Sequence, residues 1–212
     1  MISLSGVQET MLIPLAIKAS ETRRPNARIQ DLKAVEIIEQ LGLDVSKYDK
    51  FMSHEGVVAR TILFDTAMKH YIARYPQSVC ISIGCGFDSR FSRVDNGAII
   101  WYDLDFPDVI AARKRFFPQQ DRVHLIAKSA LDPTWPQAVA KQDKTVILIE
   151  GMLMYLKEEE VKQLFQIIKA NFNDVIVLAE LMPPFSAKGS KYHDTVKTTN
   201  ASFQWGIKSG KE

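Results

Sequence analysis

Five short apolar runs, spaced through the chain, constrain its fold more than any other feature. They occupy residues 78–84, 98–105, 123–128, 145–151 and 174–181, and apolar residues follow one another in each run instead of alternating with polar ones. Strands that are covered on both faces of a sheet have this pattern. The sequence therefore predicts five buried strands.

Helical patterns precede these runs and separate several of them. Strands that alternate with helices fold as a doubly wound, mostly parallel α/β sheet, which is the fold class that we predict. In the longest helical segment, Asp65 and Lys69 are spaced to form an ion pair one turn apart. The predicted helices span residues 7–19, 31–41, 54–74, 108–117 and 157–172. The last of them is expected to turn Val161, Leu164, Phe165 and Ile168 towards the core.

The charge of the chain gives no sign of a nucleic-acid or membrane partner. Its 212 residues include 27 Lys and Arg and 25 Asp and Glu, a formal net charge of +2. The basic clusters Arg23-Arg24 and Arg113-Lys114-Arg115 are predicted to be solvated faces. No run reaches the roughly 20 apolar residues of a bilayer span, and no signal peptide precedes the first helix. We expect a cytoplasmic protein.

The cysteines and histidines predict neither a disulfide nor a metal site. Cys80, in a predicted strand, and Cys85, in the turn after it, are too far apart on one extended segment to bridge, so two reduced thiols are expected. The histidines at 54, 70, 124 and 193 lack metal-ligand spacing. His124 lies in the third run and is predicted to be a core residue. No metal cofactor is expected.

A glycine-rich turn, "IGCGFDSR", follows the first predicted strand. Ligands of open α/β sheets bind outside the carboxyl ends of the strands, so this turn is a candidate binding site. The dinucleotide fingerprint needs a third glycine where the chain has Ser89, and Asp88 would repel a pyrophosphate. No Walker A sequence occurs either. We expect a ligand without phosphate at this turn, and a pair between Asp88 and Arg90 that closes it.

An acid ends the second predicted strand, about 20 residues after the glycines. Asp105, the last residue of "YDLD", is placed to accept hydrogen bonds from the ribose hydroxyls of a nucleoside. The alternative is that Asp105 only helps to start the next helix, where Pro107 suits the first helical position. A ligand with a ribose, no phosphate and a cationic centre is S-adenosylmethionine.

Five sequence blocks, spread from about residue 4 to residue 208, carry a resemblance to a known family. They are "SGVQETMLIPLAIKASETRRPNARIQDLKAVEI", "ARTILFD", "ISIGCGFDSRFSR", "WYDLDFPDVIAARK" and "ILIEGMLMYL". In order and spacing the chain resembles the leucine carboxyl methyltransferase-like family of class I methyltransferases. That family includes bacterial polyketide O-methyltransferases of the tetracenomycin type. The resemblance implies a Rossmann-like fold and S-adenosylmethionine as the cofactor.

The resemblance also implies which residues hold the cofactor. Arg60 falls where the family's arginine binds the methionine carboxylate, which a guanidinium can grip with two hydrogen bonds. Gly84 and Gly86 would let the backbone pass close to the methionine and ribose portion. Asp105 matches the family's ribose acid. Glu150 matches a cofactor-contacting glutamate, whose partner would be the cofactor's ammonium group.

The adenine contacts are implied for "KSALDP", the segment after the third run. Ser129, Leu131 and Asp132 fall in this part of the family pattern. Family members often carry an acid at or near position 129, where this chain has serine. Either Ser129 or Asp132 would therefore meet the exocyclic amine of the adenine.

Methyl transfer from a sulfonium is an in-line displacement that needs mainly positioning. A carboxylate acceptor is already ionised at neutral pH and needs no general base. A hydroxyl acceptor would need one, and only Tyr155 and His124 are candidates. We expect O-methylation of a carboxylate or acidic hydroxyl, on a small molecule or a peptide C-terminus. Met152, Met154 and Tyr155 are expected to face this acceptor.

The chain is expected to form one structural domain, with residues 1–75 as a helical lid over a cofactor-binding core of residues 76–212. Members of the resembled family continue to two further strands, so the sheet predicted here would keep an open edge. Truncation of the chain, or a partner such as a second copy covering this edge, would account for that. Two alternatives stay open: a non-catalytic module that binds cofactor or partner, and a nicotinamide oxidoreductase on the same sheet.

Overall fold

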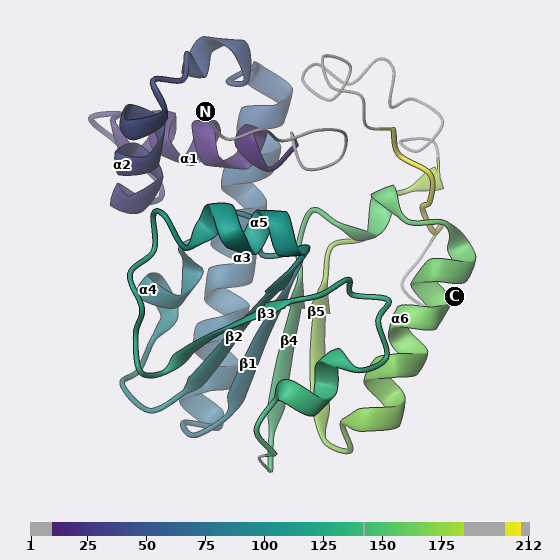
Figure 1. The fold of residues 1–212 in the computed structure, drawn as a ribbon. Helices are drawn as coiled ribbons and strands as arrows, with labels where there is room; N and C mark the ends of the chain where they lie inside the picture. Colours follow the sequence, from purple (N-terminus) through teal and green to yellow (C-terminus); the bar gives the residue numbers. More distant parts are fainter. Residues whose placement is uncertain (1–9, 142, 185–201, 209–212) are drawn as a thin grey trace.

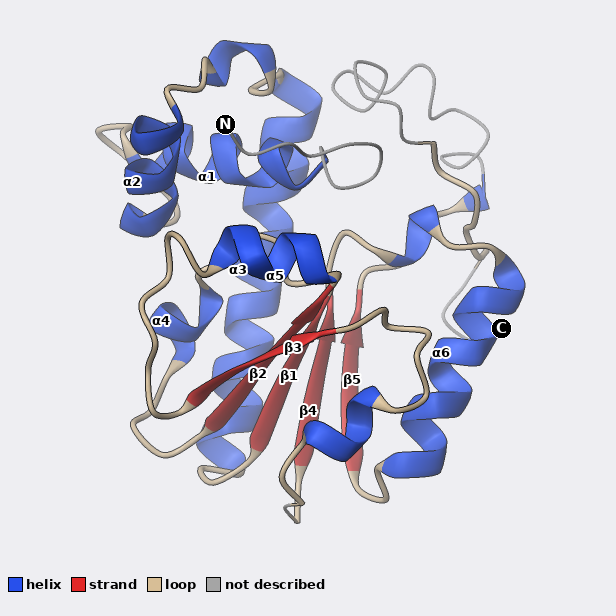
Figure 2. Ribbon diagram, in the orientation of Figure 1, coloured by secondary structure: helices blue, strands red, loops and turns tan. Residues whose placement is uncertain are grey.

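The sheet of the computed structural model is parallel throughout, with helices on both faces (Figures 1 and 2). The structure describes residues 10–141, 143–184 and 202–208. Its strand order is β3-β2-β1-β4-β5. The doubly wound α/β sheet is thus confirmed, and each strand lies within two residues of its predicted ends. The strands are β1 (Val79–Ile83), β2 (Ile100–Asp105), β3 (Val123–Ala127), β4 (Thr145–Ile149) and β5 (Val175–Ala179).

The two faces of the sheet bury different halves of the same strands, because successive side chains of a strand point to opposite faces. Val79, Ile81 and Ile83 of β1 pack in the cluster that includes α6 (Glu158–Asn171). Cys80 packs in the opposite cluster, with α3 (Phe51–Arg74) and α4 (Arg90–Val94). As a result β1 is buried along its whole length.

The prediction that every strand is buried on both faces is wrong for two of the five strands. β3 and β5 form the edges of the described sheet, and their residues are mostly half-buried or exposed. His124 of β3 is exposed and is not the predicted core residue. On α6, Phe165 is 36% exposed, whereas Leu164 is fully buried.

The first helices lie beyond the carboxyl ends of the strands (Figure 1). α1 (Leu12–Thr22) packs against α2 (Leu32–Leu41), which begins where the Asp31 carboxylate accepts the Ala34 N–H at 2.9 Å and ends at Gly42. The first residues of the predicted helix 7–19 fall outside the described residues. α3 begins three residues before its predicted start. Its Asp65 pairs with Arg90 and Arg93, so the predicted ion pair between Asp65 and Lys69 is wrong.

α5 (Pro107–Arg113) follows β2 and begins at the predicted proline. The cluster Arg113-Lys114-Arg115 was predicted to be solvated. This is correct for Lys114 and Arg115, which are exposed. It is wrong for Arg113, whose guanidinium is buried against Asp103, with 2.7 Å between Nη2 and Oδ2.

Most of the last thirty residues, including His193, lie outside the described part of the chain. Within the part that is described, no helix is long and apolar enough to cross a membrane. Nor do three or more His, Cys, Asp or Glu side chains of the described residues gather as metal ligands would. Cys80 and Cys85 are both free and buried, so the two reduced thiols are confirmed.

A buried ionic cluster ties the N-terminal helices together. Glu21 of α1 lies 3.0 Å from Arg28 Nε and 2.8 Å from Nε2 of His54 on α3, and the other ring nitrogen of His54 lies 2.5 Å from Asp49. The hydrogen bond from Arg28 is the largest cause that lowers the pKa of Glu21, to about 2 from an ordinary value of 4.5.

Glu21→Gln is expected to destabilise the protein at neutral pH by about 1–3 kcal/mol, because the main partner of Glu21, Arg28, is partly exposed to solvent. Because the pKa is lowered in the folded state, this stability is present above pH 4.5 and is lost as the pH falls towards 2. Urea unfolding of both proteins at several pH values measures the difference. A gap between wild type and variant that stays constant from neutral to acidic pH would contradict the expectation.

Candidate functional site

A cavity of about 600 Å³ lies at the carboxyl ends of the strands. Residues that follow each of the five strands line it, and α1 and α3 contribute the opposite wall. The strand order reverses between β1 and β4, and ligands of open α/β sheets bind at such a switch point. The cavity is therefore where the fold itself predicts a ligand.

The structure brings most of the predicted cofactor contacts together in this cavity. Asp132 is the exception: its carboxylate accepts hydrogen bonds from the backbone N–H and the hydroxyl of Thr134, at 2.8 and 2.6 Å, and it is not part of the lining. Of the two adenine candidates, only Ser129 lies at the cavity. The predicted residues that line it are Arg60, Gly84, Gly86, Asp105, Ser129, Leu131 and Glu150.

The glycine turn leaves no room for side chains on the cavity side. Gly84 and Gly86 have φ angles of +71° and +48°, a region that residues with a Cβ rarely adopt. A Cβ on Gly84 would lie 3.0 Å from the sulfur of Met152, and one on Gly86 would lie 3.2 Å from Met11 Cβ. A side chain at either position would therefore press on one of these two methionines, and its backbone would be strained.

Asp105 holds the glycine turn against the end of β2. One carboxylate oxygen accepts the N–H of Gly86 and the other accepts the N–H of Phe106, both at 2.8 Å. Burial raises the pKa of Asp105, while these two N–H groups lower it. The residue thus lines the cavity and also bonds to the start of α5, so its two predicted roles are compatible.

Arg60 of α3 lies between two carboxylates at the strand ends. Its Nε donates to Glu150 at 3.0 Å, and Nη1 donates to Glu180 at 3.1 Å. Glu180 also accepts the N–H of Gly151 at 2.7 Å. Burial alone would raise the pKa of Glu150, but Arg90 and Arg60 hold it below its usual range.

Sequence reasoning missed Glu180, which follows β5 and lines the cavity. A signal for it was present. Asp105 ends the second apolar run, and Glu150 and Glu180 are the next-to-last residues of the fourth and fifth runs. The carboxyl ends of parallel strands meet at one edge of a sheet, so these three acids could have been grouped.

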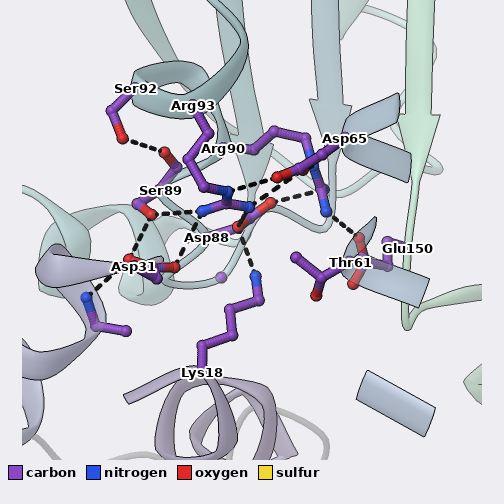
Figure 3. Close-up of polar contacts among 12 residues, drawn as sticks. Lys18, Asp31, Thr61, Asp65, Asp88, Ser89, Arg90, Ser92, Arg93 and Glu150 are labelled. Carbon is purple, nitrogen blue, oxygen red and sulfur yellow. Dashed lines mark hydrogen bonds and ion pairs between the residues drawn. The ribbon is translucent and has the colours of Figure 1, made fainter. Parts of the chain in front are cut away.

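Asp88, at the end of the glycine turn, is the centre of an ion-pair network (Figure 3). It lies 2.6 Å from Lys18 of α1, 2.8 Å from Arg90 and 3.3 Å from Arg93. The predicted pair with Arg90 is confirmed. Repulsion of a pyrophosphate by Asp88 stays a prediction, because two of the three cations around this carboxylate also pair with other acids. Ser89, in place of the third fingerprint glycine, donates to Asp31 at 2.7 Å.

The part of the cavity next to α1 and α3 is mainly apolar. Met154 and Tyr155 pack there with residues of α1 and α3 and with Phe203. Met152 also lines the cavity, and the place of all three next to the acceptor stays a prediction. Burial raises the pKa of Tyr155, so its hydroxyl stays protonated at neutral pH and is no general base. His124 is exposed on β3 and does not line the cavity. Neither base candidate is therefore suited to the role.

Comparisons with known proteins match the chain to one family. The family model described as leucine carboxyl methyltransferase matches residues 11–169. The chain is 28% identical, over 97% of its length and 77% of the relative, to the tetracenomycin polyketide synthesis O-methyltransferase TcmP of Streptomyces glaucescens. It is 27% identical, over 89% of its length and 68% of the relative, to the S-adenosyl-L-methionine-dependent methyltransferase dpfgK of Gibberella zeae.

Solved structures match more distantly. The magnesium protoporphyrin IX methyltransferase of Synechocystis with bound SAH is 15% identical, with a TM-score of 0.49, over 83% of this chain and 84% of that one. An O-methyltransferase family protein from Burkholderia thailandensis is 14% identical, with a TM-score of 0.46, over 73% of this chain. The chain spans about half of the length of that protein, with 51% covered.

Proposed function

Because the chain belongs to the leucine carboxyl methyltransferase family of S-adenosylmethionine-dependent methyltransferases, we propose that it transfers the cofactor's methyl group to an oxygen atom of a small-molecule acceptor. Its sheet and flanking helices have the class I, Rossmann-like arrangement. One observation carries the proposal. Seven of the eight residues implied by the family resemblance as cofactor contacts line a single cavity, although they come from distant parts of the chain.

The residues present fit the cofactor. The glycine turn lines the cavity with two glycines at positive φ, +71° and +48°, where residues with a side chain would be strained. Glu150 lines the cavity and supplies a negative charge there, which the cofactor's ammonium group would complement. In this proposal Arg60 binds the methionine carboxylate and Asp105 binds the ribose. Ser129 and Leu131 lie on the adenine side.

The cofactor, when bound, supplies an electrophilic methyl group on a sulfonium. The protein then has to orient the acceptor oxygen and exclude water. Tyr155 stays protonated, and Glu150 and Glu180 are both held by Arg60, so none of these three described residues is a free base. This favours an acceptor that arrives already ionised: a carboxylate or an acidic hydroxyl. TcmP is named for the synthesis of a polyketide, which supports a small molecule over a peptide.

Incubation with methyl-labelled S-adenosylmethionine tests the function. The acceptor panel contains aromatic carboxylic acids, phenols and a peptide with a free C-terminus. We expect S-adenosylhomocysteine release and a methyl label on oxygen. Mild base removes the label from a carboxylate, because esters hydrolyse, and leaves it on a phenol, because ethers do not. Tight cofactor binding without turnover of any acceptor would favour the non-catalytic module instead, and transfer to nitrogen would contradict the proposal.

Tyr155→Phe should lower turnover of a carboxylate acceptor by less than about threefold, because the protonated hydroxyl is not the base. Loss of a general base would cost a hundredfold or more. Initial rates at saturating cofactor measure the effect, with cofactor affinity as the control. A hundredfold lower rate, with unchanged cofactor affinity, would assign Tyr155 a direct catalytic role.

A further inference from the structure

We infer that Arg90 is a positioning residue, which holds the Glu150 carboxylate at the proposed cofactor site and connects it through Asp88 to the N-terminal helices. This inference rests on the proposed function, because it assumes that Glu150 binds the cofactor's ammonium group. Arg90 acts through Glu150, and its own side chain is 1% exposed.

The guanidinium of Arg90 joins three carboxylates from three different parts of the fold (Figure 3). Its Nε lies 2.6 Å from Asp65 of α3, and its Nη1 lies 2.8 Å from Asp88 of the glycine turn. Its Nη2 lies 2.7 Å from Glu150 at the end of β4. Each of the three guanidinium nitrogens meets a different carboxylate, and a lysine, whose donors all sit on one nitrogen, does not reproduce this spread.

The contact between Arg90 and Glu150 leaves hydrogen-bonding capacity unused. Although Nη2 and Oε2 are close, the two buried atoms lack hydrogen-bond geometry with any described residue. The pair therefore acts through charge and placement. The other oxygen of Glu150 is held by Arg60. Glu150 thus has both carboxylate oxygens beside guanidinium groups, Oε1 at Arg60 and Oε2 at Arg90, while the residue itself lines the cavity.

The same network reaches the N-terminal helices. The Asp88 oxygen that does not face Arg90 Nη1 lies 2.6 Å from Nζ of Lys18 on α1, and the Lys18 side chain is buried. The chain of ion pairs runs from Lys18 through Asp88 and Arg90 to Glu150. Because these groups are buried, solvent screens them little, and a change at one end is felt at the other.

A purely structural role is the competing explanation, since Arg90 also neutralises Asp65 and Asp88. A double-mutant cycle separates the two. Arg90→Lys, Glu150→Gln and the double variant are titrated calorimetrically with S-adenosylhomocysteine, which keeps the ammonium group. Arg90→Lys should weaken binding about tenfold when Glu150 is present and less than twofold in the Glu150→Gln background.

Arg122→Lys is the matched control. Arg122 binds Asp95 through two nitrogens, each 2.6 Å from a carboxylate oxygen, and neither residue lines the cavity. It should leave the affinity for S-adenosylhomocysteine unchanged. Equal weakening by Arg90→Lys in both Glu150 backgrounds, or no weakening at all, would overturn the inference. Urea unfolding of each variant shows whether the folded state is intact.

Asp65→Asn keeps the inference testable if Arg90→Lys does not fold. Asp65 anchors Arg90 from outside the cavity lining. Loosening this anchor should weaken binding two- to fivefold with Glu150 present and leave the Glu150→Gln protein unchanged. An equal loss of affinity in both Glu150 backgrounds would overturn this inference but not the proposed function. A folded wild type that does not bind, or a Glu150→Gln variant that binds normally, would overturn the proposed function as well.

Discussion

Arg113→Met is expected to lower the free energy of unfolding by about 3–5 kcal/mol, because it leaves a buried carboxylate without a counter-ion. Asp103 and Arg113 are 2% and 3% exposed. Two guanidinium nitrogens lie 3.0 and 2.7 Å from Asp103 Oδ2, and the indole of Trp101 donates to Oδ1 at 2.8 Å. A methionine fills similar space but supplies none of these donors.

Arg113→Met should also affect the glycine turn, because Arg113 Nη1 donates to the carbonyl of Gly86 at 3.0 Å. Urea unfolding measures the loss, with Lys114→Met as the control. Lys114 is the exposed neighbour, and its replacement should change stability by less than about 0.5 kcal/mol. Replacing Asp103 with asparagine in the Arg113→Met protein should restore part of the loss. An Arg113→Met protein within 1 kcal/mol of wild type would contradict the buried ion pair.

Gly84→Ala is expected to weaken cofactor binding ten- to hundredfold. The added Cβ would lie 3.0 Å from the sulfur of Met152, so either the methionine or the turn must move. Overpacking of this kind costs about 1–3 kcal/mol, which would be lost from binding because the site lies on the cavity wall. Calorimetric titration with S-adenosylhomocysteine measures the effect.

Gly97→Ala isolates the backbone contribution to that effect. Gly97 also has a positive φ, +83°, but a Cβ there would meet nothing within 4 Å. Both substitutions carry the cost of a left-handed residue, about 1–2 kcal/mol of stability. Only Gly84→Ala should change binding. Equal and unchanged affinities in the two variants would show that the cofactor does not approach Gly84.

The strands were predictable because a buried parallel strand leaves an uninterrupted apolar run in the sequence. Which strands lie at the edges was not predictable from the runs themselves. The third run contains His124 and would suit the centre or the edge of the sheet. Because β3 pairs with β2 on one side and with no described strand on the other, the histidine is exposed. The edge position depends on how all the strands pair, and a single run does not contain that information.

The site was predictable where residue type and position within an element coincide. Asp105 and Glu150 stand at or next to the ends of apolar runs, and the glycines stand where another run ends. Partner choice was not predictable. Asp65 has Lys69 one turn away, yet it binds two arginines that the turn after β1 brings near. Asp103 and Arg113 looked like a strand acid and a surface base, and only the docking of α5 on the sheet pairs them.

The central claim is that this cavity binds S-adenosylmethionine with Asp105 on the ribose. Calorimetric titration of wild type, Asp105→Ala and Asp132→Ala with S-adenosylmethionine and S-adenosylhomocysteine tests it most directly. We expect one cofactor to bind per chain and Asp105→Ala to bind at least tenfold more weakly, about 1.4 kcal/mol. Asp132→Ala, outside the cavity, should bind as wild type does. A folded wild type without affinity for either compound, or an Asp105→Ala protein with unchanged affinity, would contradict the claim.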